Sequence, residues 1–249
     1  MSVFAERRFV VVGASGGIGR EVVRQLREEG AAVFLLGRNE TKLAELGATL
    51  GCSSAVVDGR SVESVEAAFD SLPGEFAQVD GVVNCVGSVL LKPAHRTSSE
   101  EWNEVLAQNL TSAFAVLRAA YGRMKDQGGS IVLMSSAAAR VGLMNHEAIA
   151  AAKAGVVGLM LSAAATYAAR NIRVNAVAPG LVQTALTERI WQNERSAEAS
   201  RQMHPLARFG TPEEVARMIV WLLRPDNSWI TGQLFGVDGG LGTVRSAGR

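Results

Sequence analysis

The segment GASGGIG, residues 13–19, has the composition of a phosphate-binding loop. It follows an apolar run and precedes a helical pattern, which is the setting that such a loop requires. Gly13 permits a tight turn, Gly17 lets a pyrophosphate approach the backbone, and Gly19 allows helix and strand to pack closely. The N-terminus of the helix adds free N–H groups and the positive end of a dipole. The segment predicts a dinucleotide site, although its spacing G-x-x-x-G-x-G differs from the common G-x-G-x-x-G.

A second apolar run ends in LLGRN, which places Gly37 and Arg38 where the cofactor ribose is read. An acidic residue at this place would accept the ribose 2′-hydroxyl of NAD(H), but the nearest acid is Glu40. A guanidinium pairs with a 2′-phosphate through two parallel charge-assisted hydrogen bonds. Arg38 therefore favours NADP(H) over NAD(H); the alternative is that Arg38 is a solvated surface residue.

Short apolar, β-branched runs alternate with longer helical patterns along the chain. The alternation indicates right-handed βαβ units, and so an α/β fold: a doubly wound parallel sheet of about seven strands with helices on both faces. The strands are expected at 9–12, 32–36, 54–57, 81–86, 130–135, 172–178 and 234–237. The helices are expected at 17–29, 40–46, 62–71, 98–127, 147–169 and 211–223. No linker or repeat interrupts the pattern, so residues 1–249 are expected to form one domain, with the irregular stretch 180–210 as a substrate lid.

The composition excludes several classes of function. The 25 basic and 24 acidic residues give a net charge of +1, which leaves no electrostatic footprint for nucleic acid or an anionic membrane. The uncharged stretch 154–169 is too short to span a bilayer and is expected to be a core helix. No targeting segment or metal site is expected. Cys52 and Cys85 are too few for a disulfide framework and indicate thiols in a reducing, cytoplasmic compartment.

From the glycine loop to ITGQLFGVDGG near the C-terminus, the chain resembles a single-domain short-chain dehydrogenase/reductase with a Rossmann-like fold. Four further segments carry the resemblance: NCVG at 84–87, QNL at 108–110, MSSAAA at 134–139 and APGLVQT at 178–184. RFGTPEEVA from Arg208 is also typical. The resemblance implies an oxidoreductase that transfers hydride between a nicotinamide cofactor and a carbonyl/alcohol pair, in a homo-oligomer, most often a tetramer.

The resemblance also implies roles for individual residues. Ser136 corresponds to the catalytic serine, Lys153 to the lysine that holds the nicotinamide ribose, and Asn109 to the asparagine that supports this lysine through water. Asp58 lies where the family contacts adenine, and Thr184 where it contacts the nicotinamide carboxamide. The expected catalytic residues are Ser136, Lys153 and Asn109. The expected cofactor-binding residues are Gly13, Ser15, Gly17, Ile18, Gly19, Arg38, Asp58, Asn84, Gly87, Lys153 and Thr184.

One position departs from the family pattern. The acid/base tyrosine of the family lies four residues before the lysine, and here that residue is Ile149. Ser136 lies thirteen residues before Ile149, which is the usual spacing, so a shifted register does not restore the tyrosine. The i, i+4 spacing places Ile149 and Lys153 on one helix face. A side chain without a transferable proton therefore occupies the place of the phenol.

Few other groups are available to replace the phenol. Tyr167 lies fourteen residues beyond Lys153, about 21 Å along a helix, and Tyr121 falls on the preceding helix. His146 lies about 10 Å up the helix axis from Lys153 and titrates near neutral pH, but it also fits an ordinary helix-entry residue. Lys153, or a water that it holds, is the remaining candidate. A positioned acid or base contributes about 10²–10⁴ in rate, so its loss predicts slow or altered chemistry.

Two hypotheses follow from these residues. The first is an NADP(H)-dependent oxidoreductase with an unconventional proton donor, which the presence of Ser136, Lys153 and Asn109 favours. The second is a dinucleotide-binding protein without turnover, a sensor or a non-catalytic partner, which Ile149 favours. The helix at 150–168 is more apolar than a helix with one buried face requires, which favours a homo-oligomer.

Overall fold

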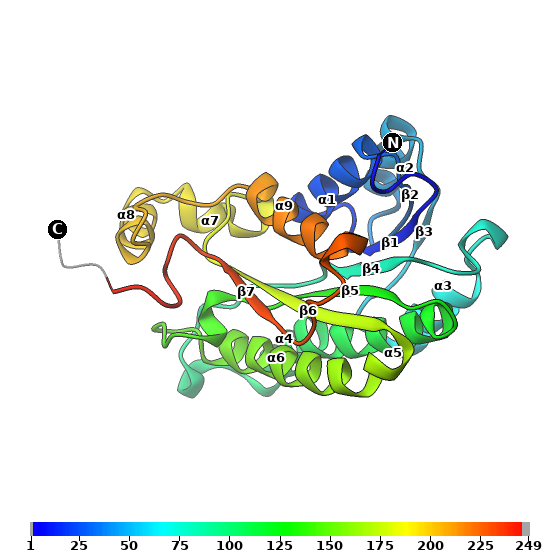
Figure 1. Cartoon of the computed structure of the whole chain (residues 1–249). Helices are drawn as coiled ribbons and strands as arrows, with labels where there is room; N and C mark the ends of the chain where they lie inside the picture. The colour runs from blue at the N-terminus through cyan, green and yellow to red at the C-terminus, as the bar shows by residue number, and fades with distance from the viewer. Residues whose placement is uncertain (1, 246–249) are drawn as a thin grey trace.

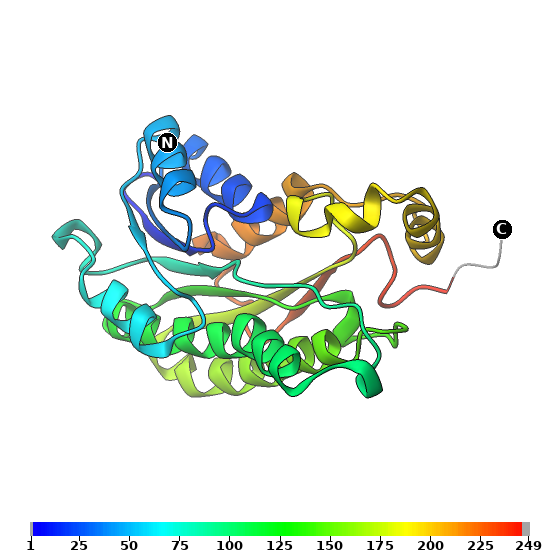
Figure 2. The same ribbon diagram turned by 180° about the vertical axis from the view of Figure 1, so that it is seen from behind.

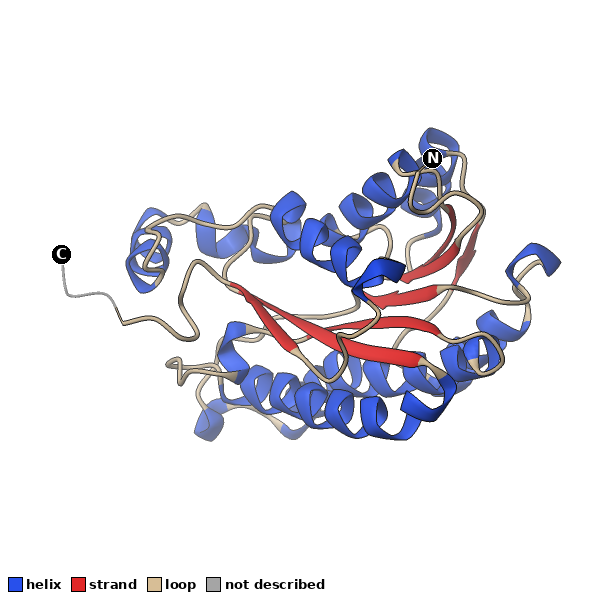
Figure 3. Cartoon of the chain, viewed as in Figure 1, coloured by secondary structure: helices blue, strands red, loops and turns tan. Residues whose placement is uncertain are grey.

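Seven parallel strands form one sheet in residues 2–245, the part of the chain that the computed structural model describes (Figures 1 and 3). Their order is β3-β2-β1-β4-β5-β6-β7, so the chain starts inside the sheet and winds outward in both directions, as predicted. The strands are β1 (Arg8–Val12), β2 (Ala32–Gly37), β3 (Ser54–Val56), β4 (Gly81–Asn84), β5 (Gly129–Met134), β6 (Ile172–Pro179) and β7 (Leu234–Val237). The order reverses between β1 and β4, where the carboxyl ends of the strands leave a crevice for a ligand.

Helices cover both faces of the sheet (Figures 1 and 2). One layer contains α1 (Gly17–Glu28), α2 (Glu40–Leu50) and α9 (Pro212–Leu223), and the other contains α3 (Val62–Asp70), α4 (Ser99–Leu106), α5 (Ser112–Met124) and α6 (Glu147–Tyr167). Phe9 and Val11 of β1 share a core with α1 and α9, whereas Val10 and Val12 share a core with α5 and α6. Because both faces of such a strand are buried, it reads as an unbroken apolar run in the sequence.

A π-helical turn, Ala107–Thr111, interrupts the helix that was expected at 98–127 and separates α4 from α5. Inside the turn, Asn109 Nδ2 donates to the Val105 carbonyl at 2.9 Å. The chain is helical on both sides, so the apolar periodicity of the sequence does not reveal the turn. Turns of this kind are frequent at functional sites, and this one carries a predicted site residue.

The stretch 180–210 is largely helical, which corrects the prediction of an irregular segment. It contains a 3-10 turn (Ala185–Thr187), α7 (Glu188–Trp191) and α8 (Glu194–Met203). The polar composition of α8 concealed it, because only Ala197 and Ser200 of this helix are buried. Both helices extend past the end of the sheet on the side of α9 (Figure 1).

The helical segment Glu147–Arg170, α6 with the 3-10 turn that follows, is the one helix of the described residues that is long and apolar enough to cross a membrane. One side of α6 nevertheless packs in the protein core through Val156, Met160 and Ala164, which confirms the prediction of a core helix. The other side is exposed and consists of small or apolar residues, among them Ala151, Ala154, Gly158 and Leu161.

Candidate active site

A cleft of about 450 Å³ lies at the carboxyl ends of β1 to β4, at the switch point of the sheet. The glycine loop, the segments after β2, β3 and β4, and residues 184–186 line it. Nine of the eleven predicted cofactor-binding residues lie on its wall: Gly13, Ser15, Gly17, Ile18, Gly19, Arg38, Asp58, Gly87 and Thr184. The other two, Asn84 and Lys153, are buried.

The glycine loop forms a cradle that a side chain would fill. Gly13 has φ +80°, and a Cβ there would lie 2.8 Å from the Cys85 carbonyl carbon. A Cβ on Gly19 would lie 2.3 Å from the Gly13 oxygen. Gly16 precedes α1 without a capping side chain among the described residues, so no side chain occupies the N–H groups that begin this helix. An uncapped helix end beside a glycine loop fits the pyrophosphate of a dinucleotide.

The segment after β6 closes over this loop. A Cβ on Gly17 would lie 2.8 Å from Thr184 Cγ2, so the Thr184 side chain packs directly on the Gly17 backbone and leaves no room for a side chain there. Thr184 in turn begins the 3-10 turn that leads into α7, and its N–H donates to Thr187 Oγ1 at 3.2 Å. The predicted lid is thereby attached directly to the predicted cofactor site.

Asn84 holds the turn after β4 and does not line the cleft. Its Oδ1 accepts from the Val86 N–H at 3.0 Å, and its Nδ2 donates to Ser112 Oγ at 3.3 Å. These bonds fix Cys85, Val86 and Gly87, which do line the cleft. Asn84 therefore shapes the cofactor cleft through the backbone of its neighbours.

Asn109 and Lys153 converge behind this turn. A Cβ on Gly87 would lie 3.1 Å from Asn109 Oδ1 and 3.5 Å from Lys153 Nζ. Lys153 is 5% exposed, and its Nζ donates to the Met134 carbonyl at 2.8 Å. Burial lowers the pKa of Lys153 to about 8, because no carboxylate among the described residues compensates the lost hydration. At neutral pH this ammonium is therefore ready to release a proton.

Ser136 follows β5 in extended backbone, with its hydroxyl accepting from the Ala138 N–H at 3.2 Å. Because that bond uses a lone pair, the proton of the hydroxyl stays available for a carbonyl oxygen. Ile149 is 4% exposed and packs in an apolar cluster. The cluster contains Val105, Ala148 and Ala152, with Leu90, Leu106 and Leu110 against it. Nothing in this cluster carries a transferable side-chain proton.

The two tyrosines and His146, the other candidates for a proton donor, lie at different distances from Ile149 along the chain. Tyr121 and Tyr167 pack against each other with ring centroids 5.1 Å apart, and Tyr167 lies at the end of α6 remote from Ile149. His146 precedes α6, one turn before Ile149, and its Nδ1 lies 2.8 Å from the Met144 carbonyl. A carbonyl only accepts, so this contact is a hydrogen bond when Nδ1 carries a proton.

Sequence reasoning missed two residues that hold the site. The first is Ser88, whose Oγ accepts from Asn109 Nδ2 at 3.0 Å and whose backbone N–H donates to Asn109 Oδ1 at 3.2 Å. Arg60 lines the cleft and binds the Asp58 carboxylate at 2.9 Å. Ser88 directly follows the NCVG segment and Arg60 lies two residues after Asp58, so their closeness to these predicted site residues was the available signal.

The lowered pKa of Lys153 predicts a pH-dependent stability. In the unfolded chain this lysine stays protonated up to about pH 10.5, whereas in the folded chain it releases its proton near pH 8. Between these values the native state binds fewer protons, so the free energy of unfolding rises with pH. Urea unfolding of wild type and Lys153→Met from pH 7.5 to 10.5 should show the wild type gaining up to ~3 kcal/mol relative to the variant. A difference that is independent of pH would contradict a buried ammonium.

The chain is similar to known oxidoreductases over nearly its whole length. A family model described as enoyl-(acyl carrier protein) reductase matches residues 13–242. The cis-4-hydroxycyclohexanecarboxylate dehydrogenase of Sinomonas cyclohexanicum is 38% identical over 247 residues, with 97% of this chain and 98% of the relative covered. The 3-oxoacyl-(acyl-carrier-protein) reductase FabG of Vibrio harveyi is 34% identical over 235 residues, with 93% and 96% covered.

The fold is also similar to that of solved structures of oxidoreductases. A short-chain type dehydrogenase/reductase from Mycobacterium ulcerans superposes with a TM-score of 0.92 at 32% identity, covering 98% of this chain and 92% of that one. The fold, the cleft at the switch point and these relatives lead to one conclusion. The chain belongs to the short-chain dehydrogenase/reductase family and is an NAD(P)-dependent oxidoreductase of carbonyl and alcohol substrates.

Proposed function

We propose that this protein is an NADP(H)-dependent oxidoreductase that interconverts a carbonyl and an alcohol in a site without the usual tyrosine. Two observations support the proposal: nine of the predicted cofactor-binding residues line one cleft, and Ile149, at the position of the family's tyrosine, is buried. When bound, the nicotinamide supplies or accepts the hydride. We propose a single domain over residues 1–249, in which residues 180–210 form the substrate lid. We also propose that the protein works in the cytoplasm, where Cys52 and Cys85 remain free thiols.

Three side chains have separate roles in the proposed reaction. The Ser136 hydroxyl donates a hydrogen bond to the substrate oxygen, where negative charge develops during reduction. Lys153 holds the ribose and, with its pKa lowered to about 8, delivers a proton from Nζ to that oxygen through a water molecule. Asn109, fixed by Ser88 and the π-helical turn, keeps that water in place. Ile149 takes no part in proton transfer and packs in the apolar cluster against α4.

The lid has a defined anchor. The buried His204 ends α8, and its Nδ1–H donates to the Ser200 carbonyl at 2.6 Å. Its Nε2 accepts from the Leu181 N–H at 3.1 Å. The imidazole thus ties the end of α8 to the start of the lid, directly after β6. Leu186, exposed on the lid, lines the cofactor cleft and closes over a bound ligand.

The cofactor preference rests on Arg38. It is exposed on the cleft wall after β2, and among residues 2–245 no carboxylate pairs with it. A free guanidinium here matches a 2′-phosphate. Calorimetry should show tighter binding of NADPH than of NADH, and Arg38→Ala should remove most of that difference while changing NADH affinity little. Equal affinities in the wild type, or an unchanged preference in Arg38→Ala, would contradict the proposal.

Restoring the phenol tests the atypical site. Ile149→Tyr places a hydroxyl one helical turn from Lys153, whose charge favours the phenolate. The small Ala148 and Ala152 beside it leave repacking at a cost of ~1–3 kcal/mol. We expect kcat/KM for one carbonyl substrate to rise about 10²-fold, with cofactor affinity unchanged.

Two variants serve as controls for that measurement. Ser136→Ala should lower kcat/KM in both the wild-type and the Ile149→Tyr background, because the serine contacts the substrate oxygen in either. His146→Ala should have little effect, since its ring lies one turn away from the phenol position. A folded Ile149→Tyr protein that is no faster than wild type would show that the pocket is not built for carbonyl reduction. A large loss in His146→Ala would make histidine the proton donor.

We also propose a homo-oligomer, a tetramer, that covers the exposed sides of α5 and α6. Phe114 and Leu161 are 44% and 52% exposed on these helices, beside small residues that allow another helix to approach. Light scattering at micromolar concentration should give four chains, and Leu161→Glu should shift the mass to smaller species. Leu186→Glu on the lid is the matched control and should leave the mass unchanged. A monomeric wild type would contradict this assembly.

A further inference from the structure

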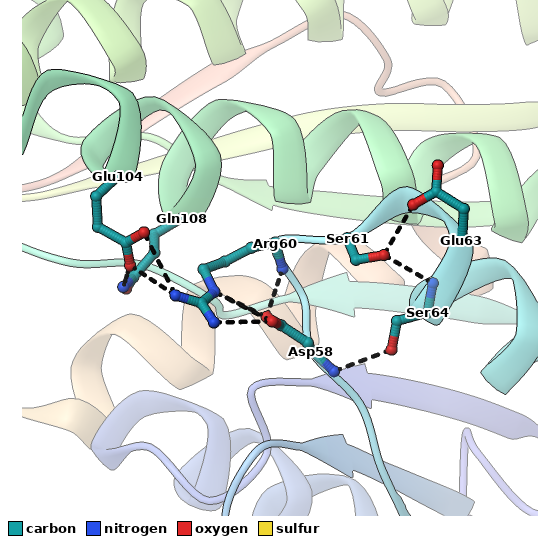
Figure 4. A network of polar contacts seen from close by, with 7 residues as sticks. All are labelled: Asp58, Arg60, Ser61, Glu63, Ser64, Glu104 and Gln108. Carbon is teal, nitrogen blue, oxygen red and sulfur yellow. Dashed lines mark hydrogen bonds and ion pairs between the residues drawn. The ribbon is translucent and has the colours of Figure 1, made fainter. Parts of the chain in front are cut away.

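Arg60, on the wall of the cleft, joins the carboxylates of Asp58 and Glu104 (Figure 4). Its Nε lies 3.0 Å and its Nη2 2.9 Å from the two oxygens of Asp58, and its backbone N–H donates to the same carboxylate at 3.0 Å. Its Nη1 lies 3.0 Å from Glu104 on α4. Gln108, which lines the cleft, donates to the same oxygen of Glu104, Oε1 (Figure 4). One guanidinium thus bridges the segment after β3 to α4.

The bridge contributes little to the stability of the fold. The side chains of Arg60, Asp58 and Glu104 are 38%, 40% and 47% exposed, and ion pairs this exposed are weakened by water. The segment after β3 is held without this bridge, because the Asp58 N–H donates to Ser64 Oγ on α3 at 3.1 Å. A role in ligand binding explains a solvated triad on a cleft wall better than a role in folding does.

The triad of Arg60, Asp58 and Glu104 interacts electrostatically with Arg38. Arg38, Asp58 and Arg60 line the same cleft. The pKa of Asp58 is lowered first by its hydrogen bonds with Arg60 and also by the charge of Arg38. The pKa of Glu104 is lowered first by Gln108, then by Arg60, and again by Arg38. Arg38 is therefore close enough for both carboxylates to attract it.

The charge balance follows from these positions. With Arg60 present, the triad carries one net negative charge, and the guanidinium lies between the two carboxylates. Without Arg60, two uncompensated carboxylates would compete for Arg38 and repel any dianion that approaches it. Opposite and like charges at the rim of a cleft act over about 10 Å at moderate ionic strength.

We propose that Arg60 is a specificity-determining residue for the cofactor: it binds both Asp58 and Glu104 and offsets one of their two negative charges, so that Arg38 stays free to bind a 2′-phosphate. This inference rests on the proposed use of NADP(H). Arg60 does not itself contact the phosphate. It acts through the two carboxylates, and its effect is larger for NADPH than for NADH because only NADPH carries the extra phosphate charge.

The test measures the dissociation constants of NADPH and NADH by calorimetry for wild type and Arg60→Gln. We expect the ratio Kd(NADH)/Kd(NADPH) to fall about tenfold in the variant, with NADH weakened at most about twofold. Arg60→Lys keeps the charge and should recover most of the ratio. At about 1 M salt, where the screening length is near 3 Å, the loss in Arg60→Gln should shrink.

A second substitution separates charge from structure. Adding Glu104→Gln to Arg60→Gln removes one of the two carboxylates, so it should raise NADPH affinity again while leaving NADH affinity unchanged. Equal weakening of both cofactors that neither Glu104→Gln nor salt relieves would overturn the proposal and assign Arg60 a shape role only. The wild-type ratio tests NADP(H) preference separately, because the change in the ratio on Arg60→Gln is measurable whichever cofactor the wild type prefers.

Discussion

Close backbone approach where β1 and β4 end is the constraint on which the site depends. The N–H groups of Gly13 and Ala14 both donate to the Leu36 carbonyl, at 2.8 and 3.1 Å, and the Cys85 N–H donates to the Val12 carbonyl at 2.8 Å. These bonds bring the ends of β1, β2 and β4 together and leave no volume for a side chain at Gly13. The first turn of α1 is consequently fixed against the sheet, and the phosphate cradle exists before a ligand arrives.

The position and the charge state of Lys153 depend on its burial against the same sheet. Lys153 reaches from α6 to the Met134 carbonyl at the end of β5, and its own carbonyl accepts from Ser135 Oγ at 3.0 Å. Carbonyl dipoles hold an ammonium in place but do not replace its hydration, so burial lowers its pKa. Cys85, which is partly buried and lines the cleft, has its thiol pKa raised to about 12 by burial and stays neutral. Lys153 is thus a cation that can give up its proton near neutral pH.

The sequence allowed the sheet, its two helical layers and most of the cleft to be predicted, because a parallel sheet buried on both faces leaves unbroken apolar runs and its ligand binds where the strands end. What escaped prediction depends on side-chain contacts between distant segments. The π-helical turn around Asn109 keeps helical periodicity on both sides, and α8 buries too few residues to show an apolar face. The Arg60 bridge needs α4 beside the segment after β3, which no local pattern encodes.

In the proposed reaction the proton must come from a group other than residue 149, because the isoleucine side chain carries no transferable proton. Ile149 packs among apolar side chains, whereas Lys153, four residues on, retains a titratable proton. The most direct measurement is the pH dependence of kcat/KM for carbonyl reduction by the wild-type protein, with alcohol oxidation measured alongside. A proton delivered from Lys153 predicts that reduction falls as pH rises through about 8 and that oxidation rises through the same pH. A reduction profile that stays level to about pH 10, or one that bends near the ordinary histidine pKa of about 6.5, would contradict the account.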